Sequence, residues 1–494
     1  MAKSKDDYKV NGSECESVPF NESTNEDGKE KCQTKAPITE YRSFLHEILN
    51  NDATRFKTLL SVCAASGFCI LGWTKGQFGP AFLDILLIGG TSLEEGSMFM
   101  TSYFIGRVLG SILGGAIYSR LNRYLILVVA MTTNSVMFAV IPWCTVYELM
   151  IAAHVLHGIS GGVMSVSLIS IAASIWGTSA RGRVYMNIFY AAFAISGFLS
   201  PIVTSPFLIP TTTDVTRYNT SWNISNNIVD EVNGNGSNIQ SVPQLNALHT
   251  ESPKSRLYIG FSISAGFAFL VTIPFVVILF KSPQQSENKV RIDELHFIGD
   301  LPIFIKILQF VNVGIFSAVF VAMDFSFSGF LTVFCVQHLQ WTKTAGSMLT
   351  SVAFFALLFG RIFGAVLTNF LKPVPMLLLS IISCTVGFVG LSVSAIFLAD
   401  VGIWISVCVI GTPLGVVWPS FLSWINDNLI PLRGKVTAYL MITAFVGALL
   451  SPMLFGYMME EVSPIWFCFL SLGKAIVTII NVTLFSLYTR FLHK

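Results

Sequence analysis

Long apolar stretches alternate with short polar segments along most of this chain. An α-helix crosses the hydrocarbon core of a bilayer with about 20 apolar residues, and twelve stretches approach or exceed that length. They lie near residues 56–86, 96–119, 124–143, 148–176, 184–209, 256–280, 305–336, 345–370, 374–398, 402–425, 435–458 and 464–488. The pattern predicts an all-α, polytopic membrane protein with twelve transmembrane helices.

Basic and acidic residues alternate between successive connections of the predicted spans. Cytoplasmic loops retain Lys and Arg, so the basic connections mark the inner side. They carry Arg120, Arg123, Arg181, Arg183, Lys281, Lys289, Arg291, Lys306, Lys372, Arg433 and Lys435. The opposite connections carry Glu94, Glu95, Glu148, Asp400, Glu460 and Glu461. This alternation predicts that both termini are cytoplasmic, and we expect a multi-pass protein of the plasma membrane.

Short motifs recur in the two halves of the chain at nearly constant spacing. FIGRVLGSIL (104–113) matches LFGRIFGAVL (358–367), HGISGGV (157–163) matches IGTPLGV (410–416), and RGRV (181–184) matches RGKV (433–436). The offsets are 254 (361 − 107), 253 (411 − 158) and 252 (433 − 181) residues. Parallel repeats of six helices are typical of the major facilitator fold, so we expect two pseudo-symmetric halves. Glycines four residues apart within the first motif favour close helix packing.

The repeat and the remaining segments give a domain organisation. Residues 1–54 are charged and poor in large apolar side chains, which predicts a disordered cytoplasmic tail. The six-helix halves cover 55–280 and 305–494, and a charged cytoplasmic linker, 281–304, joins them. One outer connection, 210–255, is long and contains three N-glycosylation acceptor sequences, which begin at Asn219, Asn223 and Asn235. It predicts a glycosylated extracellular loop.

Composition narrows the class of function. Charged residues make up 12% of the chain, against about 25% in soluble domains, and the net charge of +2 suggests no nucleic-acid partner. The sequence has no Cys/His spacing typical of a metal site and no phosphate-binding loop of an ATP-driven pump. No Ser/His/Asp set converges either, so we do not expect an enzyme.

Ionisable side chains inside the spans are the first candidates for function, because they are costly in lipid. They are Lys75, Arg107, Asp324, Arg361 and Lys474, together with His154 and His157. Asp324 is the acidic residue near the middle of a span, and it shares a helix face with Ser328. It either binds a cation or a sugar hydroxyl in a cavity, or forms a structural ion pair. The expected partners of such a pair are the arginines of the repeated packing motif.

Span one supplies aromatic and amide candidates. In WTKGQFGPAFLD (73–84), the residues Trp73, Gln77, Pro80 and Asp84 lie roughly on one face. Trp73 either stacks on a sugar ring while Gln77 binds its hydroxyls, or both side chains are packing residues. Gly79–Pro80 predicts a bend or break in the helix.

Spans four and ten supply the remaining candidates. His154 and His157, three residues apart, either carry protons at physiological pH or pack as a neutral pair. In GVVWPSFLSW (415–424), Trp418 precedes Pro419 and either lines a cavity or marks a kink.

Three motifs resemble those of the sodium-dependent glucose transporter-like branch of the major facilitator superfamily, distantly related to fucose permeases. They are GPAFLD (79–84), MDFSFSGFL (323–331), in which the branch usually has Glu at the position of Asp324, and GVVWPSFLS (415–423). The resemblance implies a hexose-type substrate driven by sodium or protons. The branch often carries Asp and Asn after the glycines of span four, whereas GGVMSVSLIS (161–170) offers Ser165 and other serines. A different small organic solute is therefore an alternative.

The sequence as a whole predicts a monomeric secondary transporter that moves a small polar solute, first of all a hexose, by alternating access. The residues expected to contact the solute are Trp73, Gln77, Ser165, Asp324, Ser328 and Trp418, and those expected in a charge network are Lys75, Arg107, Asp324, Arg361, His154 and His157. Beyond a coupling ion, Na⁺ or H⁺, we expect no cofactor. One alternative is an organic-anion carrier in which Lys75, Arg107 and Arg361 bind a carboxylate. Another is a non-transporting sensor or adaptor with the same fold.

Overall fold

The structure is a computed structural model that describes residues 52–118, 120–176, 180–210, 255–281, 303–368, 370–371, 373–429, 432 and 434–492. Its long helices are α2 (Asp52–Gly89), α3 (Leu93–Ile117), α4 (Arg123–Val140), α5 (Tyr147–Trp176), α6 (Ala180–Thr204), α8 (Leu257–Lys281), α9 (Ile303–Gln337), α10 (Lys343–Leu367), α11 (Pro373–Ile396), α12 (Asp400–Asn428), α13 (Gly434–Leu449) and α15 (Trp466–Leu492). Shorter turns of helix are η1 (Ile141–Trp143), η2 (Ser205–Phe207), α14 (Ser451–Tyr457) and η4 (Met458–Val462). Residues Phe56–Lys494 form one compact unit, and the contacts given below lie within it.

Twelve helical segments of the described residues are long and apolar enough to cross a membrane. They run from Thr54–Gly89 through Trp466–Leu484, and the eleventh, Gly434–Val462, combines α13, α14 and η4. Each coincides with a predicted span to within a few residues. The all-α class and the twelve spans are therefore confirmed.

The repeated helices α3 and α10 begin with equivalent caps. Ser92 Oγ accepts a hydrogen bond from the Glu95 amide at 3.2 Å, and Thr342 Oγ1 accepts one from the Ala345 amide at 3.0 Å. Such caps satisfy an amide that has no partner within the helix. The caps lie 250 residues apart (342 − 92), so the internal repeat extends to the starts of these helices.

Glycines of the repeated motif let α3 and α10 approach their neighbours closely. Gly106 lies against the backbone of Val155 and Gly158 in α5, and Gly360 lies against the backbone of Thr412 in α12. A Cβ atom at either glycine would overlap a backbone carbonyl. The predicted role of this motif in close helix packing is confirmed.

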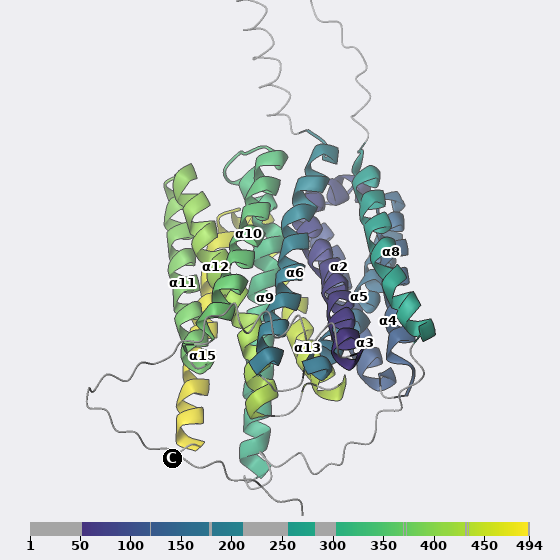
Figure 1. Ribbon diagram of the computed structural model, residues 1–494. Helices are drawn as coiled ribbons and strands as arrows, with labels where there is room; N and C mark the ends of the chain where they lie inside the picture. Colours follow the sequence, from purple (N-terminus) through teal and green to yellow (C-terminus); the bar gives the residue numbers. More distant parts are fainter. Residues whose placement is uncertain are drawn as a thin grey trace, which may run out of the picture. The chain divides into compact units, whose positions relative to one another are not determined.

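Helices of the first six spans contact helices of the last six along two seams. In one seam α6 packs against α10, and in the other α3 packs against α13 and α14 (Figure 1). Ser347 Oγ of α10 donates to the Pro201 carbonyl of α6 at 3.0 Å, and Ser170 Oγ of α5 donates to Thr437 Oγ1 of α13 at 3.1 Å. Helices α4 and α8 lie on one side of this unit and α11 and α15 on the other (Figure 1). The division into halves at 280 and 305 stays a prediction.

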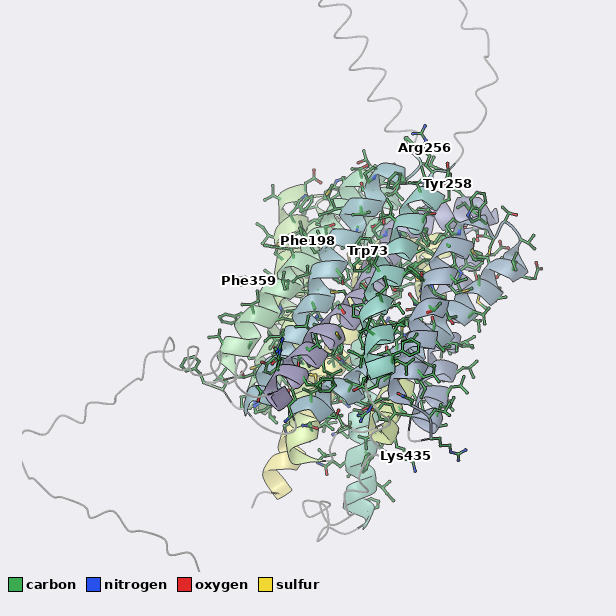
Figure 2. All side chains as sticks on the ribbon, turned by 45° about the vertical axis from the view of Figure 1, so that its right-hand side comes forward. Trp73, Phe198, Arg256, Tyr258, Phe359 and Lys435 are labelled. Atoms are coloured by element: carbon green, nitrogen blue, oxygen red, sulfur yellow. The ribbon has the colours of Figure 1, made fainter. Side chains whose placement is uncertain are left out.

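The two ends of the bundle differ in charge. Arg120, Arg123 and Lys435 lie at what we call the basic end, and Glu94, Glu95, Glu148, Asp400, Glu460 and Glu461 lie at the acidic end. Figure 2 shows Lys435 at the opposite end from Arg256 and Tyr258, which belong to the acidic end. The acceptor sites Asn219, Asn223 and Asn235 and the linker 282–302 lie outside the described residues, so sidedness and glycosylation stay predictions.

Candidate functional site

An ion pair joins α2, the first spanning helix, to α9, the seventh. Lys75 Nζ lies 2.5 Å from Asp324 Oδ2, and the two side chains are 3% and 19% exposed. The ammonium group also lies 4.7 Å from the ring centre of Phe325 and 5.6 Å from that of Phe354. The two charges therefore compensate each other in surroundings that exclude most water.

A close approach of the two helices brings this pair together. Gly79 of α2 lacks a side chain where the backbone of Ser328 in α9 lies against it. Lys75 precedes Gly79 by four residues, about one helical turn, and Asp324 precedes Ser328 by the same spacing. The side chains one turn back on each helix consequently meet.

The pair borders a small central cavity. The lining residues are Thr74, Lys75, Phe78, Met100, Tyr103, Phe104, Phe325, Ser328 and Gly329. The space open to the centre of a water molecule is about 20 Å³, room for one or two waters. Ser328, predicted to contact the solute, lines this cavity, and its hydroxyl donates to the Asp324 carbonyl at 3.0 Å. The cavity is too small for a hexose in the described arrangement.

Arg107 of α3 is hydrogen-bonded within the first six spans and lies over the ring of Phe445 in α13, 4.2 Å from its centre, and it forms no salt bridge with Asp324. Its Nη1 donates to Tyr103 Oη at 3.0 Å, and its Nη2 donates to Ser165 Oγ at 2.5 Å and to the Gly161 carbonyl at 3.3 Å. The expected ion pair with Asp324 is wrong, because Lys75 occupies that position. Ser165 lies in this network and does not line the central cavity.

Arg361 of α10, the repeat counterpart, lies in a different environment. Its guanidinium carbon is 5.2 Å from the ring centre of Tyr190 and 5.0 Å from that of Phe193, both on α6. Its Nε and Nη1 are buried without a hydrogen-bond partner among the described residues. The expected pair with Asp324 is wrong here too, because the carboxylate is bonded to Lys75.

Trp73 and Gln77 lie on the same face of α2, as predicted, but they face α8. Trp73 Nε1 donates to Ser264 Oγ at 2.7 Å, and its ring packs on Phe267 at 4.8 Å between centres. Ser264 Oγ in turn donates to Gln77 Oε1 at 2.9 Å. Neither residue lines the central cavity, and Figure 2 shows Trp73 between the two ends of the bundle. Of the bend or break predicted at Gly79–Pro80, the break is wrong, because α2 continues through Pro80; the bend stays a prediction.

His154 and His157 lie among aromatic rings. His154 Nδ1 is 2.8 Å from the Met150 carbonyl. The His157 ring packs edge-on against Tyr103 at 5.3 Å and Phe138 at 4.9 Å, and both its nitrogens are buried without a partner among the described residues. This environment agrees with the packed-pair interpretation.

A second, smaller cavity lies beside the histidines. Its lining residues are Thr74, Gln77, Phe78, Ile85, Phe138, Ile141, His154, His157 and Phe261. The space open to the centre of a water is about 10 Å³, which suits a single water molecule at most. Thr74 and Phe78 line both cavities, so the two lie next to each other along α2.

Trp418 of α12 bridges the two sets of helices. Its Nε1 donates to Tyr190 Oη of α6 at 2.9 Å, and its ring stacks on Phe320 of α9 at 5.9 Å between centres. Trp418 does not line the central cavity. Its position is that of a packing residue next to Arg361.

Sequence reasoning missed a second buried ion pair. Lys343 Nζ at the start of α10 lies 2.6 Å from Asp84 Oδ1 at the end of α2, and Asp84 Oδ2 accepts from the Ile209 amide at 2.8 Å. The signal available in the sequence was an acid, Asp84, and a base, Lys343, that lie toward the same side of the predicted bundle. Lys474 of α15 has no carboxylate partner in the described ranges and donates to Ser326 Oγ at 3.0 Å.

Comparisons with known proteins define the class. The family model of the Major Facilitator Superfamily matches residues 257–452. The solved structure of a human organic anion transporter is similar with a TM-score of 0.61 at 11% identity, over 88% of this chain and all of that one (100%). The fucose:proton symporter of E. coli is similar with a TM-score of 0.58 at 11% identity, over 88% of this chain and 99% of that one. The chain has the major facilitator fold, and its resemblance to that superfamily is confirmed.

A curated relative is similar to this chain over most of its length. The human protein named Sodium-dependent glucose transporter 1 is 22% identical over 427 residues, which cover 84% of this chain and 76% of that protein. This confirms the resemblance to the sodium-dependent glucose transporter-like branch that the three motifs indicated.

Proposed function

We propose that this chain is a secondary active transporter that moves a small polar solute by alternating access. The observation that carries the proposal is the Lys75–Asp324 ion pair, buried between α2 and α9 beside a cavity. Charged residues within spans usually mark a solute or ion pathway. In major facilitator proteins that pathway lies between two six-helix halves, here 55–280 and 305–494.

A hexose is the first solute to consider, because the curated relative is named a sodium-dependent glucose transporter. Asp324 is the carboxylate nearest the cavity and is our candidate coupling site for sodium or a proton. A cation bound to this carboxylate would neutralise it and release Lys75. That release would link ion binding to a change in the contact between the two halves.

Alternating access requires contacts between the halves to break in turn. The Asp84–Lys343 pair holds α2 to α10 at the acidic end. The Ser170–Thr437 hydrogen bond holds α5 to α13 toward the basic end. Both are formed here, in keeping with the small volume of the cavity.

Uptake into proteoliposomes tests the proposal. Labelled glucose would be offered under an inward sodium gradient, an inward proton gradient, both or neither, to the wild type and to Asp324→Asn. Glu148→Gln, an exposed carboxylate at the acidic end, is the matched control. Gradient-stimulated uptake that Asp324→Asn abolishes and Glu148→Gln retains supports a coupled hexose transporter. A folded protein that moves no solute under any gradient would contradict transport and favour a sensor or adaptor.

Location and sidedness belong to the same proposal. We propose a monomer in the plasma membrane with both termini in the cytoplasm and glycans on Asn219, Asn223 and Asn235. Glycosidase treatment of the wild type and of a variant with all three changed to Gln tests the glycans. Antibody access to terminal tags in intact and permeabilised cells tests the orientation.

A further inference from the structure

Positive charge is in excess at the centre of the bundle. Lys75, Arg107 and Arg361 lie close enough to interact electrostatically. Asp324 forms an ion pair with Lys75 and also attracts Arg361 without contacting it, so one carboxylate faces three cations. In the described ranges the other buried carboxylate is Asp84, which is already paired at the acidic end. Burial of a cation without a counter-charge is costly, so the centre favours an additional anion.

The internal repeat shows where that anion is needed. The two Nη atoms of Arg107 donate to the hydroxyls of Tyr103 and Ser165, and its Nε is the one nitrogen of that guanidinium buried without an acceptor among the described residues. With the offsets of 254 and 253 residues, the corresponding positions in the second half are Leu357 (103 + 254) and Trp418 (165 + 253). Neither supplies an oxygen. The second half therefore keeps the arginine of the motif and lacks both of its side-chain acceptors.

The unmatched donors belong to Arg361. Its Nε and Nη1 are buried without an acceptor among the described residues, and a buried donor left unpaired is destabilising. The rings of Tyr190 and Phe193 offset part of this cost through their faces. Because these rings belong to α6 and the arginine to α10, separation of the α6–α10 seam would open the guanidinium to the space between the halves.

We propose that the solute carries a carboxylate and that Arg361 binds it. The proposal rests on the transport function proposed above and replaces the hexose considered there by another substrate class, a small organic acid. The planar guanidinium matches a carboxylate with two parallel hydrogen bonds. Lys75 is paired with Asp324. Arg107 keeps one unpartnered nitrogen, Nε, whereas Arg361 keeps two, Nε and Nη1, which can face both oxygens of a carboxylate. The acid enters when the seam is open and supplies the acceptors that the second half lacks.

A purely structural Arg361, held by its aromatic neighbours alone, is the competing explanation. It predicts that loss of the guanidinium lowers stability without any change in ligand preference. The binding site proposed here predicts a change in ligand preference as well. Glucose and glucuronate make a matched pair of probes, because they differ at C6 by a hydroxymethyl group against a carboxylate. Lactate tests a carboxylate without a sugar ring.

The experiment measures equilibrium binding of labelled glucuronate, lactate and glucose to the purified full chain, together with uptake of each into proteoliposomes. We expect wild type to bind glucuronate, and Arg361→Gln to lose about tenfold or more in affinity, as expected when a charge-assisted hydrogen bond is lost. Arg361→Lys keeps the positive charge but loses the pair of parallel donors, so its affinity for glucuronate should lie between those of wild type and Arg361→Gln. Arg120→Gln, exposed at the basic end, should bind like wild type.

The outcomes separate this proposal from the transport proposal. Binding of both acids supports a general carboxylate site, and binding of glucuronate alone supports a sugar-acid site. If wild type takes up glucose, and glucuronate neither inhibits this uptake nor is taken up in its place, the carboxylate site is contradicted and the transport proposal is supported. Wild type that binds glucuronate without moving it supports the site and contradicts transport. If Arg361→Gln does not fold, the binding of glucuronate and of glucose to wild type still tests whether the solute must carry a carboxylate.

Discussion

Asp84 of α2 and Lys343 of α10 form a buried ion pair, 2.6 Å apart, that joins the first spanning helix to the eighth at the acidic end. The carboxylate is fully buried, and its second oxygen accepts a hydrogen bond from the amide of Ile209, just beyond η2. One carboxylate thus ties three segments together.

Removal of one member of this pair should destabilise the protein more than removal of both. A buried charge without its partner costs about 3–5 kcal/mol, whereas replacement of the whole pair is often close to neutral. We expect Asp84→Asn and Lys343→Met each to lower the melting temperature in detergent markedly, and the double variant to recover most of the loss. Glu148→Gln, exposed at the same end, should melt like wild type. A double variant as unstable as the sum of the two single variants would contradict the pairing.

The close contacts of the repeated motif give a second prediction. Gly106→Ala would press a methyl group against the backbone of Val155, and Gly360→Ala against that of Thr412. Overpacking of this kind costs about 1–3 kcal/mol, so both variants should have lower melting temperatures. Gly266→Ala in α8 is the control, because nothing lies within 4 Å of its added Cβ. Equal stability of all three variants would show that α3 and α10 can shift away from their neighbours at little cost.

Hydrophobicity and charge were sufficient to predict the architecture. The twelve spans could be found because the bilayer sets the length of each apolar stretch. The repeat could be found because close packing restricts residues such as Gly106 and Gly360 to glycine, which leaves a readable trace in both halves. These constraints act on single helices or neighbouring pairs, so a pattern in the chain is enough to reveal them.

The pairing of charges at the centre could not be predicted in the same way. The spans contain four Lys or Arg residues that could pair with Asp324, and the choice of Lys75 depends on the contact of Gly79 with Ser328 between helices far apart in the chain. Contacts between distant helices also decide which neighbour a side chain faces. Trp73 turns toward Ser264 of α8 and away from the central cavity, which no periodicity within α2 specifies.

The position of Trp73 gives a third prediction. Trp73→Phe removes the hydrogen bond to Ser264, which is worth about 1 kcal/mol, and keeps an aromatic ring against Phe267. We expect a small loss of thermal stability, similar to that of Ser264→Ala, and unchanged affinity for whichever solute is bound. Equilibrium binding of the solute that wild type binds measures the affinity. A large loss of affinity in Trp73→Phe that Ser264→Ala does not share would instead place the indole on the solute.

The partner of Asp324 can be established by a double-mutant cycle, which isolates the energy between two residues. Asp324→Asn leaves Lys75 buried without a counter-charge, so it should lower stability by about 3–5 kcal/mol. Adding Lys75→Met should restore much of that loss, because it removes the uncompensated ammonium from its position beside Phe325 and Phe354. Adding Arg107→Gln should restore nothing, because that residue bonds to neighbours other than Asp324. Melting temperatures of the single and double variants in one detergent measure both couplings. Rescue by Arg107→Gln in place of Lys75→Met would mean that the arginine, and not the lysine, compensates the carboxylate.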